Sequence, residues 1–279
     1  MTRARDRRPA IALTRTVLVA LVALVAAAGC RPARPRPQWT GILPKPDVLL
    51  AQVAARRRAV TTLRGFAHIS YESAEEKLGS RHAVVVAPPD RFRLEILSPI
   101  GALAVVTANA RELAVWVRRD HRTYRGPATA SSIGAWVGVP LGVADIDAAL
   151  AGLPPERQAT GAAAIAYDES AGLVRVHVPI AGGRQELWYA GDGPNPVACE
   201  TTLDGTNQML RIAFADYRTI GSVTLPLDVD MRLEPAGRRV HVRWEPPTPN
   251  AVVRDDAFAF PVREGVEEMP LERYTQGAS

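Results

Sequence analysis

Apolar and polar residues alternate with a period of two through most of residues 63–245, and this pattern constrains the fold more than any other feature. In residues 240–244, for example, Val, Val and Trp alternate with His and Arg. Successive side chains of a strand point to opposite faces, so each such segment predicts a strand with one apolar and one wet face. Turn residues such as Pro88-Pro89-Asp90 and Gly182-Gly183 separate the segments. About eleven strands can be counted.

Helical spacing is found in two regions. The apolar residues of 46–63 recur at helical intervals, with Asp47 as a possible N-cap and Gly65 just beyond the end. Residues 130–153 fit two short helices that end before Pro154. The sequence therefore predicts a mainly β, α+β fold. We expect an antiparallel, open half-barrel of about eleven strands, with an N-terminal helix and a short helical insertion covering an apolar cavity.

The first 29 residues have the order of a bacterial export signal. Five Arg lie in residues 3–15, and an apolar run then leads from Val17 to Gly29, directly before Cys30. That run has 13 residues, whereas a helix needs about 20 apolar residues to cross a bilayer. The segment resembles a lipoprotein signal peptide, which predicts removal of residues 1–29 and acylation of Cys30. Cys199 is then the one remaining cysteine, and we interpret it as a small strand residue.

The same signal accounts for most of the net charge. The chain carries 34 Lys+Arg against 29 Asp+Glu, but residues 1–29 hold +4 of the resulting +5. The basic pI therefore does not indicate a nucleic-acid partner, which needs clustered cations. We expect a basic, Pro-rich tether over residues 30–45, one domain over residues 46–269 and a tail over residues 270–279. Eight Lys+Arg in residues 30–64 would favour contact with anionic headgroups, although a solvated linker explains them equally well.

Catalytic constellations are absent from the sequence. The five His are scattered, and there is no HExxH pair for zinc, no GxSxG elbow, no Gly-rich phosphate loop and no CxxC pair. Asp228 and Asp230 project from one strand face, as the paired acids of a glycosidase would. Their alternation with apolar residues favours a solvated face instead. We therefore expect no enzymatic activity, no metal and no cofactor.

Four segments, taken together, resemble the LolA/LolB family of periplasmic lipoprotein carriers and outer-membrane lipoprotein receptors. They are residues 63–69 (LRGFAHI), residues 91–101 (RFRLEILSPIG), the stretch from 136–141 (WVGVPL) to 152–154 (GLP), and residues 244–250 with Phe258, Phe260 and Pro261. Each motif is degenerate alone, and their order and spacing over most of residues 47–269 carry the resemblance. It implies a half-barrel whose hydrophobic cavity holds the acyl chains of a lipoprotein.

The resemblance also implies a membrane-insertion loop. In the receptor, an apolar residue on a projecting loop helps to pass cargo into the membrane, and Ile100 occupies that place here, with Leu103 close by. The family pattern more often has Leu at the position of Ile100. Pro99 and Gly101 suit a tight turn, whose tip normally carries polar residues. The alternative is that Ile100 folds back beneath the helices of residues 130–153 as part of the core.

The alternation within the strands places one set of residues on a common apolar face. These candidates for the lining of an acyl-chain cavity are Phe92, Leu94, Ile96, Val115, Val117, Leu210, Ile212, Phe214, Met231 and Trp244. A filled core would produce the same pattern, so both interpretations stay open at this point.

The leading hypothesis is a monomeric, lipid-anchored protein of the outer membrane that faces the periplasm. It would take acylated lipoproteins from a LolA-like carrier and insert them into the outer membrane. A second hypothesis keeps the cavity but assigns another amphiphile, such as a glycolipid. A third is a structural lipoprotein of the envelope that has a filled core and binds no lipid.

Overall fold

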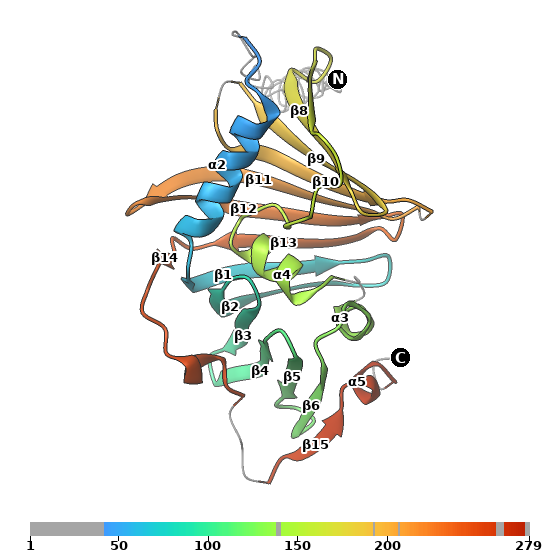
Figure 1. The fold of residues 1–279 in the computed structure, drawn as a ribbon. Helices are drawn as coiled ribbons and strands as arrows, with labels where there is room; N and C mark the ends of the chain where they lie inside the picture. Colours follow the sequence, from blue (N-terminus) through green and yellow to red (C-terminus); the bar gives the residue numbers. More distant parts are fainter. Residues whose placement is uncertain (1–41, 138–140, 192, 206, 261–264, 277–279) are drawn as a thin grey trace, which may run out of the picture. The chain divides into compact units, whose positions relative to one another are not determined.

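The alternating segments form the strands of one sheet, as the sequence predicts (Figure 1). The computed structural model describes residues 42–137, 141–191, 193–205, 207–260 and 265–276, all of which belong to one unit, Gln38–Ser279. The expected export signal, Cys30 and residues 31–41 of the expected tether lie outside the described residues. No helix among the described residues is both long and apolar enough to cross a membrane.

Fifteen strands are found in the described residues, compared with the eleven counted from the sequence. They are β1 (Leu63–Glu72), β2 (Lys77–Ala87), β3 (Arg91–Ser98), β4 (Gly101–Ala108), β5 (Glu112–Val117), β6 (Arg122–Pro127), β7 (Ala164–Asp168), β8 (Leu173–Ile180), β9 (Gly183–Ala190), β10 (Pro196–Leu203), β11 (Met209–Ile220), β12 (Val223–Glu234), β13 (Arg238–Trp244), β14 (Thr248–Pro249) and β15 (Glu267–Pro270). Several of the additional strands are short. They are identified by their backbone pairing with neighbouring strands rather than by an alternating pattern in their own sequences.

The sheet runs in the order β15-β6-β5-β4-β3-β2-β1-β13-β12-β11-β10-β9-β8-β7, with β14 paired to β1 at one side. Its two ends are β15 and β7, so the sheet is open rather than closed into a barrel. Neighbouring strands are antiparallel, as expected, except that β15 pairs with β6 in parallel. This exception arises because β15 follows a long crossover from β14, and a crossover can return a strand in either direction.

The helices are short and few among the described residues: α2 (Pro46–Ala59), α3 (Ala130–Val137), α4 (Val143–Leu150), α5 (Glu272–Gln276) and the 3₁₀ turn η1 (Asp255–Phe258). Figure 1 shows α2 and α4 lying across one face of the sheet. We call this the inner face, and the opposite one the outer face. Helix α2 begins at Pro46, two residues earlier than an N-cap at Asp47 would place its start, and Lys45 is the N-cap. It also ends before Gly65, at Val60.

Backbone hydrogen bonds, rather than Pro154, end helix α4. The N–H of Gly152 donates to the carbonyl of Ala149 at 3.0 Å, and the N–H of Leu153 donates to that of Ala148 at 2.7 Å. This Schellman-type ending requires a left-handed residue, and Gly152 has φ +67. A Cβ at Gly152 would also lie 2.4 Å from the ring of Pro226, so glycine permits the close approach of α4 to β12.

The core fills the space between the inner face and the helices. Ile133 of α3 and Leu150 of α4 join strand residues such as Phe92, Ile212 and Val229 in one buried cluster. The expected tail over residues 270–279 must be corrected, because Leu271 is 2% exposed and belongs to this core. The folded region therefore continues through β15 into α5. The sequence around Leu271 is mostly polar and did not predict burial. Leu271 is buried because its N–H donates to the carbonyl oxygen of Arg125 of β6 at 2.8 Å, which holds it against that strand.

Candidate functional site

The ten candidate lining residues divide into two groups by burial. Seven of them are buried in the core: Phe92, Val115, Leu210, Ile212, Phe214, Met231 and Trp244. Their alternation does place them on the inner face, and all seven belong to the core cluster that also contains residues of α2, α3 and α4. In this arrangement they act as core residues, which is the second interpretation that the sequence left open.

The other three candidates, Leu94, Ile96 and Val117, are only half-buried. The strand registers bring two of them together, because Ile96 pairs with Ala104 on β4 and Ala104 pairs with Val117 on β5. Leu94 precedes Ile96 on the same face of β3. Towards these ends of β3 and β5, the covering of the inner face is therefore incomplete.

Neighbouring strands extend this incompletely covered region. In β1 and its two neighbours β2 and β13, the region includes Ile69 and Val240, which are half-buried, and Leu78, which is 57% exposed. We refer to Ile69, Leu78, Leu94, Ile96, Val117 and Val240 as the open apolar layer. Ile69, Leu78 and Val240 were not among the lining candidates predicted from the sequence. Their alternation within β1, β2 and β13 was a usable signal, but Gly65 and Gly79 interrupt it in the first two of these strands.

A histidine within this layer is uncharged. His82 of β2 pairs with Ile96 and is 8% exposed, and its Nδ1 lies 2.9 Å from the carbonyl oxygen of Ser80. Burial lowers the pKa of His82, and the neighbouring His68 lowers it further, while the contact with Ser80 opposes the shift. Because an ordinary histidine already titrates below pH 7, His82 is neutral at pH 7. His82 therefore adds no charge to this layer at neutral pH.

The turn between β3 and β4 exposes apolar side chains. Ser98 pairs with Gly101, so Pro99 and Ile100 form the tip, and Gly101 has φ +104. Ile100 is 77% exposed and does not fold back beneath the helices. Leu103 is also exposed. The guanidinium of Arg118 donates to the carbonyl oxygen of Ile100 at 2.9 Å, which places a cation directly behind the apolar tip.

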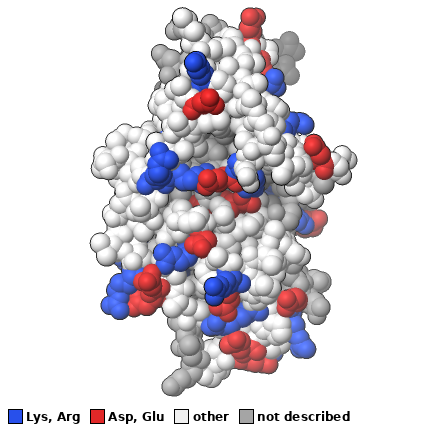
Figure 2. All heavy atoms as spheres, viewed as in Figure 1, with Lys and Arg blue, Asp and Glu red and all other residues white. Residues whose placement is uncertain are grey.

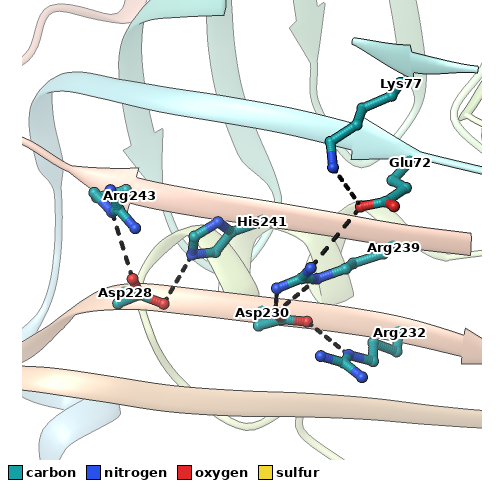
Figure 3. Close-up of polar contacts among 8 residues, drawn as sticks. All are labelled: Glu72, Lys77, Asp228, Asp230, Arg232, Arg239, His241 and Arg243. Atoms are coloured by element: carbon teal, nitrogen blue, oxygen red, sulfur yellow. Dashed lines mark hydrogen bonds and ion pairs between the residues drawn. The ribbon is translucent and has the colours of Figure 1, made fainter. Parts of the chain in front are cut away.

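The outer face of β12 and β13 carries the two acids that could have served as a catalytic pair (Figure 3). Asp228 lies 2.9 Å from Nε2 of His241 and 3.6 Å from Nε of Arg243. Asp230 accepts hydrogen bonds from Arg239 and from Arg232. Burial alone would raise the pKa of Asp230, but the two arginines hold it below its usual value. Asp230 is therefore an ion-pair partner rather than a proton donor.

This network continues onto the next hairpin. Arg239 also lies 3.9 Å from Glu72 of β1, and Glu72 lies 3.3 Å from Lys77 of β2. The ion pairs thus link four neighbouring strands across the outer face (Figure 3). Figure 2 shows a similar mixture of signs on the face with α2 and α4, where Lys and Arg lie beside Asp and Glu. Both faces are typical of a surface that is stabilised by local pairs.

The remaining candidates for chemistry give no reactive site. Within the described part of the chain, no three His, Cys, Asp or Glu side chains come close enough together to hold a metal ion. Cys199 is a buried residue of β10, as the sequence predicts. Burial raises the pKa of its thiol to about 12, so the reactive thiolate is scarce at neutral pH.

Three solved structures are similar in fold to this chain. They are a domain described as an outer membrane lipoprotein-sorting protein from Vibrio parahaemolyticus (TM-score 0.53, covering 77% of this chain and 96% of that one), a LolA superfamily protein from Nitrosomonas europaea (0.52, 78% and 99%) and a DUF1329 family protein from Desulfovibrio piger (0.52, 77% and 98%). The fold is LolA-like. Sequence identity to each is 10%, so the likeness concerns the fold.

No protein-family model matches the sequence, and no curated protein matches it either. The LolA-like fold confirms the expected mainly β, open half-barrel with a helical insertion over its inner face. The resemblance seen in the sequence is thus supported for the LolA-like fold.

Proposed function

We propose that the protein binds the acyl chains of a lipid or lipoprotein on the inner face of its LolA-like sheet. The observation that carries this proposal is the open apolar layer, where Leu94, Ile96 and Val117 are only half-buried although they lie on the core face. Water contact with such a surface costs about 25 cal/mol per Å². An acyl chain laid on the layer would remove that cost for both partners.

The energetics favour a carrier for this kind of cargo. Each CH₂ group that leaves water contributes ~0.8 kcal/mol, so an acyl chain cannot cross an aqueous compartment unprotected. The inner face already carries apolar side chains along β1–β5 and β13. Chains that enter at the open apolar layer could extend towards the core only if the covering helices give way. Phe92 and Val115, the next inner-face residues along β3 and β5, are already buried.

The finer proposal is delivery of lipoproteins to the outer membrane. Acylated Cys30 would hold the protein on the membrane facing the periplasm, and the basic residues of 31–64 would contact anionic headgroups. A LolA-like carrier would supply the acylated lipoprotein. Ile100 and Leu103 would then enter the acyl layer of the membrane during release. No catalytic step, metal or cofactor is part of this proposal, and a monomer suffices for it.

Two other functions are supported by particular observations. The open apolar layer has no feature specific to lipoproteins, so a glycolipid or another amphiphile fits it as well. The burial of seven of the ten lining candidates favours a scaffold lipoprotein that binds no lipid. The three functions differ in whether lipid is bound and in which lipid it is.

Lipid analysis of an unanchored protein separates them. A Cys30→Ser variant, exported and purified without detergent, is extracted and its lipids are identified by mass spectrometry. We expect acyl chains in about equimolar amount, carried by lipoproteins that co-purify. A glycolipid would favour the second function, and absence of lipid would support the scaffold.

A variant pair locates the binding surface. Leu94→Glu puts a charge into the open apolar layer, whereas Leu203→Glu alters an apolar side chain of β10 that is already 45% exposed. We expect Leu94→Glu to lose the bound lipid and Leu203→Glu to retain it, with both variants folded. Retention of lipid by a folded Leu94→Glu variant would contradict binding at the layer.

A further inference from the structure

A pocket of about 730 Å³ lies on the outer face of the sheet. Its floor is formed by β1, β2 and β3, and its wall by residues 252–260, which follow β14. Arg64 and Phe66 of β1 point into it, alternating with the buried Leu63 and Ala67 of the inner face. Its volume is within the range of about 300–1,000 Å³ that is typical of small-molecule sites.

The lining of this pocket is mainly apolar. Phe66 and Val85 come from the sheet, and Val253 and Phe260 come from the wall. Phe66 is 40% exposed, which is unusual for a phenylalanine on the wet face of a strand. The guanidinium of Arg81 lies 3.9 Å from the centre of its ring and is itself held by Glu245 at 2.7 and 2.9 Å. The ring is therefore positioned before any ligand arrives.

The wall is tied to the floor by polar contacts. Arg93 of β3 donates to the carbonyl oxygen of Ala259 at 3.2 Å, and Arg91 lies 2.8 Å from Asp255. Arg91 also lies over the ring of Phe258, 4.9 Å from its centre. These contacts hold residues 255–259 against the beginning of β3, so the pocket is a built feature of the fold.

Among the described residues, the charges that line the pocket leave the guanidinium of Arg64 without an ion-pair partner. Arg93 is paired with Glu95 at 2.7 Å, and Arg254 is paired with Asp256 at 2.8 Å. Arg64 forms no ion pair with any residue that the structure describes, and it is exposed at the pocket. A mainly apolar pocket with the exposed guanidinium of Arg64 in its lining is complementary to a ligand that has an apolar body and one anionic group.

We propose that this outer-face pocket binds a single-chain anionic amphiphile, with its chain against Phe66, Val85, Val253 and Phe260 and its carboxylate or phosphate head at Arg64. The site is separate from the inner face, so it goes beyond the proposed function and does not depend on it. Two amphiphile sites on opposite faces would let the protein hold a free fatty acid or lysolipid while the inner face carries other cargo.

Calorimetric titration of the purified protein with dodecanoate, dodecyl phosphate and dodecanol tests the proposal. We expect the two anions to bind about tenfold more tightly than the alcohol, since a charge-assisted contact to Arg64 distinguishes them. Arg64→Gln should remove that preference, and Arg111→Gln, at an exposed arginine of the β4–β5 turn, should not. If dodecanoate and dodecyl phosphate differ, the tighter one identifies the head group.

Variants in the apolar lining locate the ligand. Phe66→Asp and Val253→Asp alter the floor and the wall separately, so at least one should fold, and each folded variant should bind dodecanoate at least about tenfold more weakly. Leu203→Asp, which lies outside both the pocket and the open apolar layer, should bind it normally. The proposal is overturned if the wild type does not bind dodecanoate, or if binding survives in the pocket variants. Loss in Leu94→Glu alone would place the ligand on the inner face and also overturn it.

Discussion

The indole Nε1 of Trp244 donates a hydrogen bond to the carbonyl oxygen of Leu150 at 3.0 Å, and both side chains are buried. Trp244 is the last residue of β13, and Leu150 is the last residue of α4. Because a helix leaves its last carbonyls without partners, this bond both caps α4 and fastens it to the inner face. The sheet thus holds the helix that would have to move if acyl chains reached the core.

Removing this hydrogen bond should loosen α4. Trp244→Phe retains an aromatic ring but leaves the buried carbonyl of Leu150 unsatisfied, which costs about 1–3 kcal/mol. We expect a decrease of that size in the free energy of unfolding, measured by urea titration. Hydrogen exchange should become faster in α4, in particular at residues 148–153.

Trp188→Phe is the matched control. The Nε1 of Trp188 is also buried, but it has no hydrogen-bond partner among the described residues, and its ring lies 5.6 Å from the Arg175 guanidinium. Its replacement should change the free energy of unfolding by less than about 0.5 kcal/mol. Equal effects of the two substitutions would show that the bond to Leu150 contributes nothing specific.

Asp147 of α4 should make the protein less stable as the pH rises. Its side chain is 0% exposed, and neither carboxyl oxygen has a hydrogen-bond partner among the described residues. Burial, together with the charge of Asp90, raises its pKa to about 8, while Arg91 acts in the opposite direction. Between about pH 4 and pH 8 the unfolded chain alone loses this proton, so the free energy of unfolding falls by up to ~1.4 kcal/mol per pH unit.

The Asp147→Asn variant isolates this effect, because its side chain does not titrate. Unfolding by urea at several pH values should give similar stabilities for variant and wild type near pH 4. The variant should gain by several kcal/mol, in order of magnitude, as the pH approaches 8, and the difference should then level off. A difference that does not vary with pH would mean that the carboxyl group is solvated in the folded state.

Ile100→Glu should impair delivery without affecting the fold. Ile100 is exposed at the tip of the β3–β4 turn, so the free energy of unfolding should change by less than about 0.5 kcal/mol. Burial of its side chain in an acyl layer would contribute roughly 1.5–3 kcal/mol, which the glutamate forgoes. We expect normal uptake of an acylated lipoprotein and reduced transfer to vesicles. Transfer at the normal rate would exclude the turn from delivery, and Ile100→Leu serves as the conservative control.

Acylation of Cys30 is the prediction on which membrane attachment depends. Intact-mass analysis of the membrane fraction should give a chain that begins at Cys30 and carries acyl groups. Cys30→Ser should be released from the membrane, because it lacks the acylated residue. A mature chain that still contains residues 17–29 would contradict this interpretation of the N-terminal segment.

The sequence by itself determined about eleven of the fifteen strands that the structure describes, and the face of the sheet on which their residues lie. Alternation requires only that each side chain points away from its neighbours, so it placed Ile96 and Ile212 correctly on the inner face and Asp228 on the outer face. It also located both helices of the insertion. These features are local, and they hold wherever the strands are placed in the sheet.

Only the tertiary structure decided what those faces do. Ile96 and Ile212 have the same pattern, yet Ile212 is 1% exposed and Ile96 is half-buried, because the covering of the inner face is complete over one and incomplete over the other. The partners of Asp228 come from β13, and the pocket at Phe66 exists because residues 252–260 return across the outer face. Each of these depends on contacts between residues far apart in the chain, which a periodic pattern within one strand cannot encode.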